Sequence, residues 1–369
     1  MKHPATQRPE NVTKLALLTA TALTLLLSAV QVDSAVGDTF KHDVYDYKVL
    51  SVDPATQTGT VSIALAYQKT LEGDITLPAK VDYENYAYNV TEIVDRGFIN
   101  STNLTALTVS EHIKKIGKGA FAYCYSLASL TIPDSVTDIE ESAFYSANSL
   151  LNLQLGSGII TIKTDTFSHA TNLTTLTIPD TVTTIEGSAF YGLTGLTNLH
   201  LSSALTYIGE YAFYEAKSLE SLTIPDSVAV IERGAFYGAI NLSNLIIGSG
   251  VVSIKNMAFY FVTVPGAYFK GNAPIMEPTV FYKKPTLYYI EGKQGWTSPT
   301  WNEYNTAIWV PDESLKVSFE FQNGRLILTY GAGRLQESAN LADWSVVDES
   351  GHYEVEVSSN GNRFYRAVQ

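Results

Sequence analysis

The chain has 369 residues, of which 45% are hydrophobic and 17% are charged, a composition typical of folded domains rather than of disordered chains. Its formal net charge of −13 argues against nucleic acid or an anionic membrane surface as the main partner. Cys124 is the single cysteine, so the sequence excludes both an intramolecular disulfide framework and a cysteine-based zinc site.

The first 35 residues have the pattern of a secretory signal peptide. Basic residues precede an uncharged apolar run from Leu15 to Val30, and small residues follow around Ala35. We therefore expect a signal peptide over 1–35 and a secreted or cell-surface protein that begins near Val36. The apolar run is somewhat long, so an uncleaved signal anchor stays open as an alternative. No second apolar run of membrane length follows, and we expect no membrane span in the mature chain.

Short strand patterns separated by turn residues occupy the next segment. They fall at residues 47–52, 59–65 and 74–78. An array of repeats exposes an apolar face and open strand edges at its first unit unless something covers them. We assign residues 36–89 to a β-rich N-terminal cap.

A phenylalanine then recurs every 23 residues. The series consists of Phe98, Phe121, Phe144, Phe167, Phe190, Phe213, Phe236 and Phe259. A fixed period in this range is the signature of a solenoid, in which each unit is one coil that buries its apolar face only against its neighbours. The sequence predicts a solenoid over residues 90–262.

Two apolar columns lie nine and eleven residues after each phenylalanine, as in Leu130 and Ile132 or Leu176 and Ile178. Polar residues alternate with them, which is the period of a half-buried strand. One such strand in every coil predicts a parallel β ribbon along the solenoid. The corner that follows the strand alternates between a Pro-Asp-Ser/Thr type and a Gly/Ser-rich type, which doubles the period to 46 residues.

The segment from Leu127 to Phe144 matches throughout the pattern L-x-x-L-x-I-P-x-x-V-x-x-I-x-x-x-A-F. With its seven further copies, the chain resembles the BspA-type, or treponemal-type, leucine-rich repeats. This resemblance implies a right-handed, α/β-type leucine-rich repeat solenoid. It also implies a bacterial secreted or surface protein that binds other proteins or cell surfaces and has no catalytic residues.

The pattern decays after residue 262. Residues 263–310 contain Trp296, Trp301 and Trp309 and suit a C-terminal cap of the solenoid, although such an aromatic cluster can also bind sugar. Residues 311–369 alternate apolar and polar residues around an Asn323-Gly324 turn. We expect a small all-β, sandwich-like module there, of unknown role.

Two surfaces are candidate binding sites. The first is the outward face of the ribbon, which is uncharged and rich in hydroxyl and amide groups; its central members are Asn152, Gln154, Thr175, Thr177, Asn198, His200, Ser221 and Thr223. The second is an aromatic column formed by Tyr145, Tyr191, Tyr214 and Tyr237. Strand propensity also favours threonine, and tyrosines also pack over coil edges, so a purely structural role is open for both surfaces.

Sequence motifs of catalysis are missing: there is no Gly-x-Ser-x-Gly elbow, P-loop, dinucleotide motif or His-Glu-x-x-His. His169 and His200 lie in different columns of separate coils, so we expect no metal site and no cofactor. The sequence predicts a monomeric protein that binds an extracellular protein or cell-surface component along the solenoid. A polysaccharide-binding module and a spacer that presents the C-terminal module are the alternatives.

Overall fold

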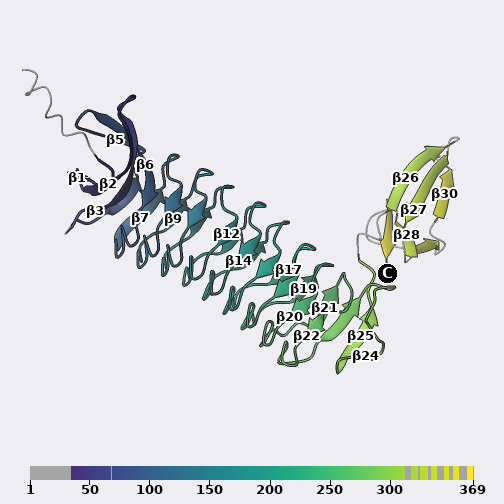
Figure 1. Cartoon of the computed structure of the whole chain (residues 1–369). Helices are drawn as coiled ribbons and strands as arrows, with labels where there is room; N and C mark the ends of the chain where they lie inside the picture. The colour runs from purple at the N-terminus through teal and green to yellow at the C-terminus, as the bar shows by residue number, and fades with distance from the viewer. Residues whose placement is uncertain are drawn as a thin grey trace, which may run out of the picture.

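The computed structural model describes residues 35–67 and 69–311 and, beyond them, the backbone of six strands between 317 and 368 (Figure 1). The predicted signal peptide, apart from Ala35, lies outside the described residues. Figure 1 shows the coils stacked in a single row from the N-terminal strands to β25 (Tyr304–Ile308).

The N-terminal segment is a sheet that passes directly into the solenoid. It contains β1 (Thr39–His42), β2 (Tyr45–Asp53), β3 (Thr58–Leu65), β4 (Glu72–Thr76), β5 (Lys80–Tyr83) and β6 (Tyr86–Ile93). The order β1-β2-β3-β6 continues into β8 (Lys115–Ile116) and β10 (Asp138–Ile139), while β5 pairs with β6. Strand β4 instead pairs in parallel with β7 (Asn103–Thr108), the first strand of the ribbon.

The predicted parallel ribbon is present. Its strands are β7, β9 (Ser129–Thr131), β11 (Asn152–Gln154), β13 (Thr175–Thr177), β15 (Asn198–His200), β17 (Ser221–Thr223) and β19 (Asn244–Ile247). Main-chain pairing divides the ribbon into the groups β4-β7-β9-β11, β13-β15 and β17-β19-β21-β23-β25-β24. A second ribbon, on another side of each coil, runs through β12 (Thr161–Ile162), β14 (Thr184–Ile185), β16 (Tyr207–Ile208), β18 (Val230–Ile231), β20 (Ser253–Ile254) and β22 (Ile275–Met276).

The repeated phenylalanines form one stack through the centre of the solenoid. From Phe98 to Phe281, successive ring centroids lie 5.1 to 5.6 Å apart with interplanar angles of 2 to 16°. The eight rings from Phe98 to Phe259 have no exposed surface. Each ring from Phe121 to Phe259 therefore packs against an equivalent ring on both sides, which explains why the 23-residue period shows no slip.

The described part of the chain contains no helix, although the resemblance implied an α/β-type solenoid. The physical reason lies beside each phenylalanine. The residues two before and two after it have φ between 55 and 79°, from Arg96 and Asn100 in the first coil to Met257 and Phe261 in the last. A left-handed residue ends a right-handed helix. Two of them within five residues make this side of each coil a pair of tight turns.

The alternating corners join the coils in pairs. The aspartate of each Pro-Asp corner accepts a hydrogen bond from the main-chain N–H of the serine in the next corner, with N···O distances of 2.7 or 2.8 Å; the pairs are Asp134–Ser157, Asp180–Ser203 and Asp226–Ser249. A Cβ on Gly156 would lie 2.4 Å from the main chain of Pro133, so this corner needs glycine for the close approach. The 46-residue period is thus a property of corner packing.

The C-terminal end of the ribbon continues through β21 (Gly266–Phe269), β23 (Thr286–Tyr289) and β25, and β24 (Thr300–Trp301) closes it as an antiparallel partner of β25. Trp296 packs against Phe269, Tyr289 and Trp301 and donates its indole N–H to the Gly271 carbonyl at 3.1 Å. This tryptophan is therefore engaged in packing at the end of the solenoid.

The six C-terminal strands form two antiparallel sheets of three. One contains β26 (Val317–Gln322), β27 (Arg325–Tyr330) and β30 (His352–Glu356), and the other contains β28 (Arg334–Ser338), β29 (Ser345–Asp348) and β31 (Phe364–Val368). The predicted Asn323-Gly324 turn lies outside the described residues, between two strands that pair in antiparallel fashion.

Candidate functional site

The structure exposes all eight predicted ribbon residues. They lie at the first and third positions of β11, β13, β15 and β17, while the leucine between each pair turns inward. Within the paired strands β13 and β15, Thr175 is aligned with Asn198 and Thr177 with His200. The side chains therefore form two rows on one surface, as the two-residue period of a strand requires.

The main-chain pairing is interrupted at two places among these residues. At paired steps a residue just after the strand donates to the next strand, as from Ile132 to Gln154 at 3.0 Å and from Ile178 to His200 at 2.9 Å. Strands β11 and β13 do not pair, and neither do β15 and β17. The N–H groups of Leu155 and Leu201, which occupy the donor position at these two steps, have no main-chain acceptor within the described residues.

We call the β11/β13 interruption the first seam and the β15/β17 interruption the second seam. The leucines on the β11 and β15 side of each seam, Leu153, Leu155, Leu199 and Leu201, are only half-buried, although their columns predict core positions. At the first seam the surface is hollowed into a groove of about 340 Å³ between β9 and β13, lined by Leu151, Asn152, Gln154 and Thr177 among others. The ribbon is therefore open where the predicted binding residues lie.

The coils stay joined elsewhere at both seams. Across the first seam, the Thr181 hydroxyl donates to the Ile159 carbonyl at 2.9 Å and the Phe144 N–H donates to the Thr166 carbonyl at 2.9 Å. Strands β12 and β14 of the second ribbon also pair across it. The missing hydrogen bonds are therefore confined to the ribbon face.

The predicted tyrosine column is part of a longer aromatic ladder. Neighbouring ring centroids lie 4.7 to 5.6 Å apart through Tyr123, Tyr145, His169, Tyr191, Tyr214, Tyr237, Tyr260 and Tyr282. Tyr145 does not touch Tyr191, because the His169 ring lies between them. Where the tyrosine column has a small residue, as at Ala122 and Ser168, the next residue supplies the ring from a left-handed backbone position.

Sequence reasoning missed four rings of this region: Tyr123, His169, Phe261 and Tyr282. The signal that could have found Tyr123 and His169 is the aromatic residue directly after a small residue in the tyrosine column.

Stacking limits what the middle of the ladder can bind. Tyr191, Tyr214 and Tyr237 stack with centroids 4.7 Å apart and interplanar angles of 3 and 8°, so their faces cover one another. Burial in this stack, with smaller contributions from the neighbouring tyrosines, raises the pKa of Tyr214. Open ring faces belong to the ends of the ladder, where the Phe261 ring is tilted and 39% exposed and Tyr282 is 58% exposed.

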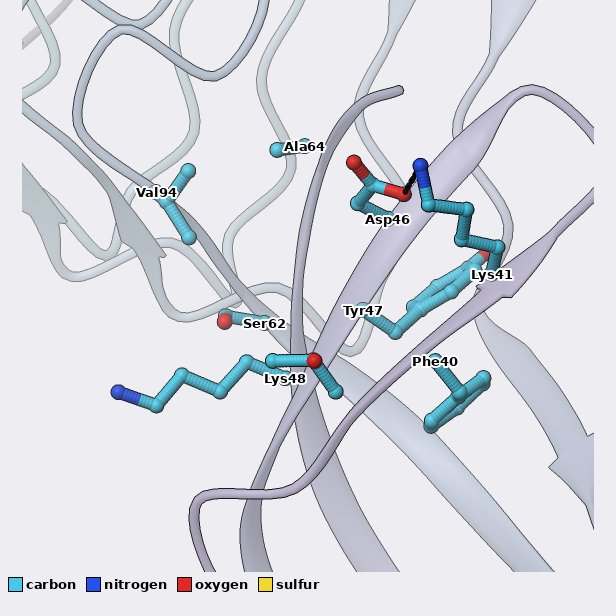
Figure 2. Close-up of a pocket in the computed structure, with 9 residues that line it drawn as sticks. Phe40, Lys41, Asp46, Tyr47, Lys48, Ser62, Ala64 and Val94 are labelled. Carbon is cyan, nitrogen blue, oxygen red and sulfur yellow. Dashed lines mark ion pairs between the residues drawn. The ribbon is translucent and has the colours of Figure 1, made fainter. Parts of the chain in front are cut away.

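A further hollow of about 310 Å³ lies on the N-terminal sheet and was not foreseen from the sequence. Figure 2 shows the Lys41 side chain directed toward Asp46, with the amine 3.4 Å from the carboxylate, and Lys48 directed away from that pair. Burial raises the pKa of Tyr47, which also lines this hollow. The carboxylate is already paired with an amine, so the hollow offers no free general base.

Other reactive groups of the described chain are inert or dispersed. Cys124 is buried, and this burial raises the pKa of its thiol to about 12, so it fills the core as a small apolar residue. No three His, Cys, Asp or Glu residues gather at metal-binding distances anywhere in the described part of the chain. The same residues contain no helix that is long and apolar enough to cross a membrane.

Comparison with known proteins gives both a family and a set of similar structures. The BspA type leucine rich repeat region matches in six copies over residues 80–192 and 160–288, which together span more than half of the chain. No curated protein sequence matches the chain.

The similar solved structures are bacterial proteins. A leucine rich cell surface protein from Faecalibacterium prausnitzii is 23% identical over 63% of this chain and 76% of its own, with a TM-score of 0.44. A leucine rich repeat protein of T. pallidum is 19% identical over 63% and 86%, with a TM-score of 0.40. The pneumococcal vaccine antigen PcpA is 20% identical over 70% and 95%, with a TM-score of 0.38.

At such identities and TM-scores these likenesses say nothing about a ligand. The six repeat matches carry the assignment, and they fall on the coils that stack their phenylalanines. The chain belongs to the BspA-type leucine-rich repeat family.

Proposed function

We propose that this protein is secreted or held at the cell surface, and that it recognises a protein partner through the ribbon face of its solenoid. One observation carries the proposal: eight uncharged polar side chains lie exposed around two openings of the ribbon. A repeat array with such an extended face suits recognition rather than catalysis.

Chemistry of the ribbon supports a neutral, hydrogen-bonding partner surface. Its eight residues are amides, hydroxyls and one imidazole, without a carboxylate or an amine. Such groups donate and accept hydrogen bonds without the desolvation cost of buried charge. The half-buried leucines at the seams add apolar contact beneath them.

Capture of extracellular proteins by the purified full-length chain tests this function. A variant with lysine at Gln154, Thr177, His200 and Thr223 should lose the captured partner, because four added charges would have to be desolvated on binding. The matched control places four lysines at exposed positions beside the second ribbon, namely Thr137, Ile160, Thr206 and Val252. Retained capture by the first variant, or an equal loss of capture in the control, would show that the ribbon is not the binding site.

Glycan binding is the second candidate, and the open ends of the aromatic ladder favour it. Phe261 and Tyr282 expose ring surface that the stacked middle of the ladder does not. A soluble oligosaccharide should then bind to the full-length chain and lose affinity on Tyr282→Ala, whereas Tyr214→Ala should leave it unchanged. If the two changes lower the affinity for the oligosaccharide equally, the ends of the ladder are not the glycan site.

A further inference from the structure

The two seams have the same design, 46 residues apart. At the first seam Asn152 and Gln154 face Thr175 and Thr177; at the second, Asn198 and His200 face Ser221 and Thr223. At each seam, one strand therefore carries an asparagine and a second nitrogen-bearing side chain, and the facing strand carries two hydroxyl side chains. Each seam also has two main-chain N–H groups with no main-chain acceptor within the described residues: those of Leu155 and Thr174 at the first seam, and those of Leu201 and Glu220 at the second.

Paired steps differ from the seams in their main chain and not in their side-chain chemistry. At the β9/β11 step, Thr131 and Gln154 are aligned on strands whose main-chain groups bond to each other. The seam thus adds free main-chain donors and acceptors to an otherwise similar polar surface. A ligand that supplies carbonyl acceptors would satisfy these donors without opening the fold, because the coils remain bonded on their other sides.

Spacing indicates the conformation of such a ligand. Two coils advance about 10 Å when neighbouring strands lie ~4.8 Å apart. Three residues of an extended β-chain cover about the same length, but the third residue then faces the opposite side. A polyproline II chain has three residues per turn and a rise of ~3.1 Å, so it returns to the same face after about 9 Å. Only the second conformation presents the same groups to both seams.

We infer that the two seams are equivalent subsites for the carbonyl groups of one polyproline II segment of a partner protein, which runs along the solenoid and across the strands. This inference rests on the proposed function and names the class of partner. Such a segment has no internal hydrogen bonds, so its carbonyls are free to accept from the seam donors. Its preformed conformation also lowers the entropic cost of binding.

Fluorescently labelled decaproline is the probe, measured by anisotropy against the purified full-length chain. At ~3.1 Å per residue it is about 31 Å long and reaches both seams. Gln154→Lys and His200→Lys should each weaken binding by at least about tenfold, because either change removes one of two linked subsites. Thr108→Lys, in the same column but at the paired β7/β9 step, should change affinity by less than about twofold.

A glycine-serine decapeptide, which has no polyproline II preference, should bind at least about tenfold more weakly than decaproline. Absence of decaproline binding, or an equal loss with Thr108→Lys, would overturn the inference. Displacement of decaproline by a linear uncharged glucan with the same dependence on Gln154 and His200 would overturn it too, since the seams would then hold a sugar. If decaproline does not bind but capture of a protein partner still depends on the ribbon residues, this inference fails and the proposed function stands.

Discussion

At the scale of single residues, the phenylalanine column determines whether the coils stack. Every ring from Phe121 to Phe259 has its faces against the rings above and below, and none of the eight repeated phenylalanines is exposed. A missing ring would leave a cavity that the rigid coils on both sides cannot close.

Phe190→Ala should therefore lower the free energy of unfolding by about 3–5 kcal/mol, the usual cost of such a change in a packed core. Urea unfolding followed by circular dichroism measures the loss. Thr174→Ala, at an exposed position of the preceding coil, is the control and should change stability by less than about 0.5 kcal/mol. A loss below about 1 kcal/mol for Phe190→Ala would mean that the stack does not support the solenoid.

At this scale, the sequence predicted burial correctly where all residues of a repeat column lie in the same environment. The phenylalanines, the leucines of the β9 and β13 strands and Cys124 are all buried, as their columns indicate. It was incomplete for the aromatic ladder, since His169 belongs to a neighbouring column, and its ring takes the place between Tyr145 and Tyr191 where the tyrosine column has Ser168. A period in the sequence aligns positions, but it does not show that two columns supply one row of rings.

At the scale of elements, the Pro-Asp corners hold the coils together in pairs. Asp180 Oδ1 accepts hydrogen bonds from the main-chain N–H and the hydroxyl of Ser203, at 2.8 and 3.0 Å. The main-chain bond, followed by the hydroxyl bond, holds the pKa of Asp180 below its ordinary value of 3.8. Ser157 lowers the pKa of Asp134 in the same way.

A lowered pKa in the folded state means stability that is present above the ordinary pKa and lost as the pH falls through the lowered one. Asp180→Ala should therefore melt at a lower temperature than the unchanged protein at pH 7, and the two melting temperatures should converge as the pH falls below about 4. Melting temperatures measured between pH 7 and pH 2 decide this. Glu111→Gln removes an exposed carboxylate that has no ion pair or hydrogen bond among the described residues, and its curve of melting temperature against pH should stay parallel to that of the parent. If the melting temperature of Asp180→Ala stays below that of the parent by the same amount at every pH, the effect of the change does not come from the charge of the carboxylate.

The seams are the feature of the elements that sequence could not predict. Leu153 and Leu155 occupy the same apolar columns as Leu130 and Ile132, yet the first two are only half-buried. Pairing depends on how closely each corner approaches the next, and the close approach of Gly156 to Pro133 ties β11 to β9 rather than to β13. The residue types in a repeat column cannot show with which of its two neighbouring strands a strand pairs, because both neighbours carry similar residues in that column.

At the scale of the whole molecule, the solenoid forms one continuous core with different surfaces on its sides. The ribbon face is neutral and open at two places, whereas acidic and basic side chains meet beside the second ribbon, where Lys163 bonds to both Asp138 and Glu140. The hydrogen bond from Lys163 lowers the pKa of Glu140. This division supports the proposal that the ribbon recognises the partner, and it favours a role in coil register for the charged side.

Amide hydrogen exchange of the full-length chain, with and without the protein partner it captures, tests recognition through the ribbon most directly. The unpaired N–H groups of the seams, those of Leu155, Thr174, Leu201 and Glu220, should exchange fast in the free protein. We expect the bound partner to slow exchange there and across β13 and β17, and to leave the second ribbon unchanged. Slowing confined to the second ribbon, to the N-terminal sheet or to the C-terminal strands would show that the partner binds elsewhere and that the ribbon only holds the fold together.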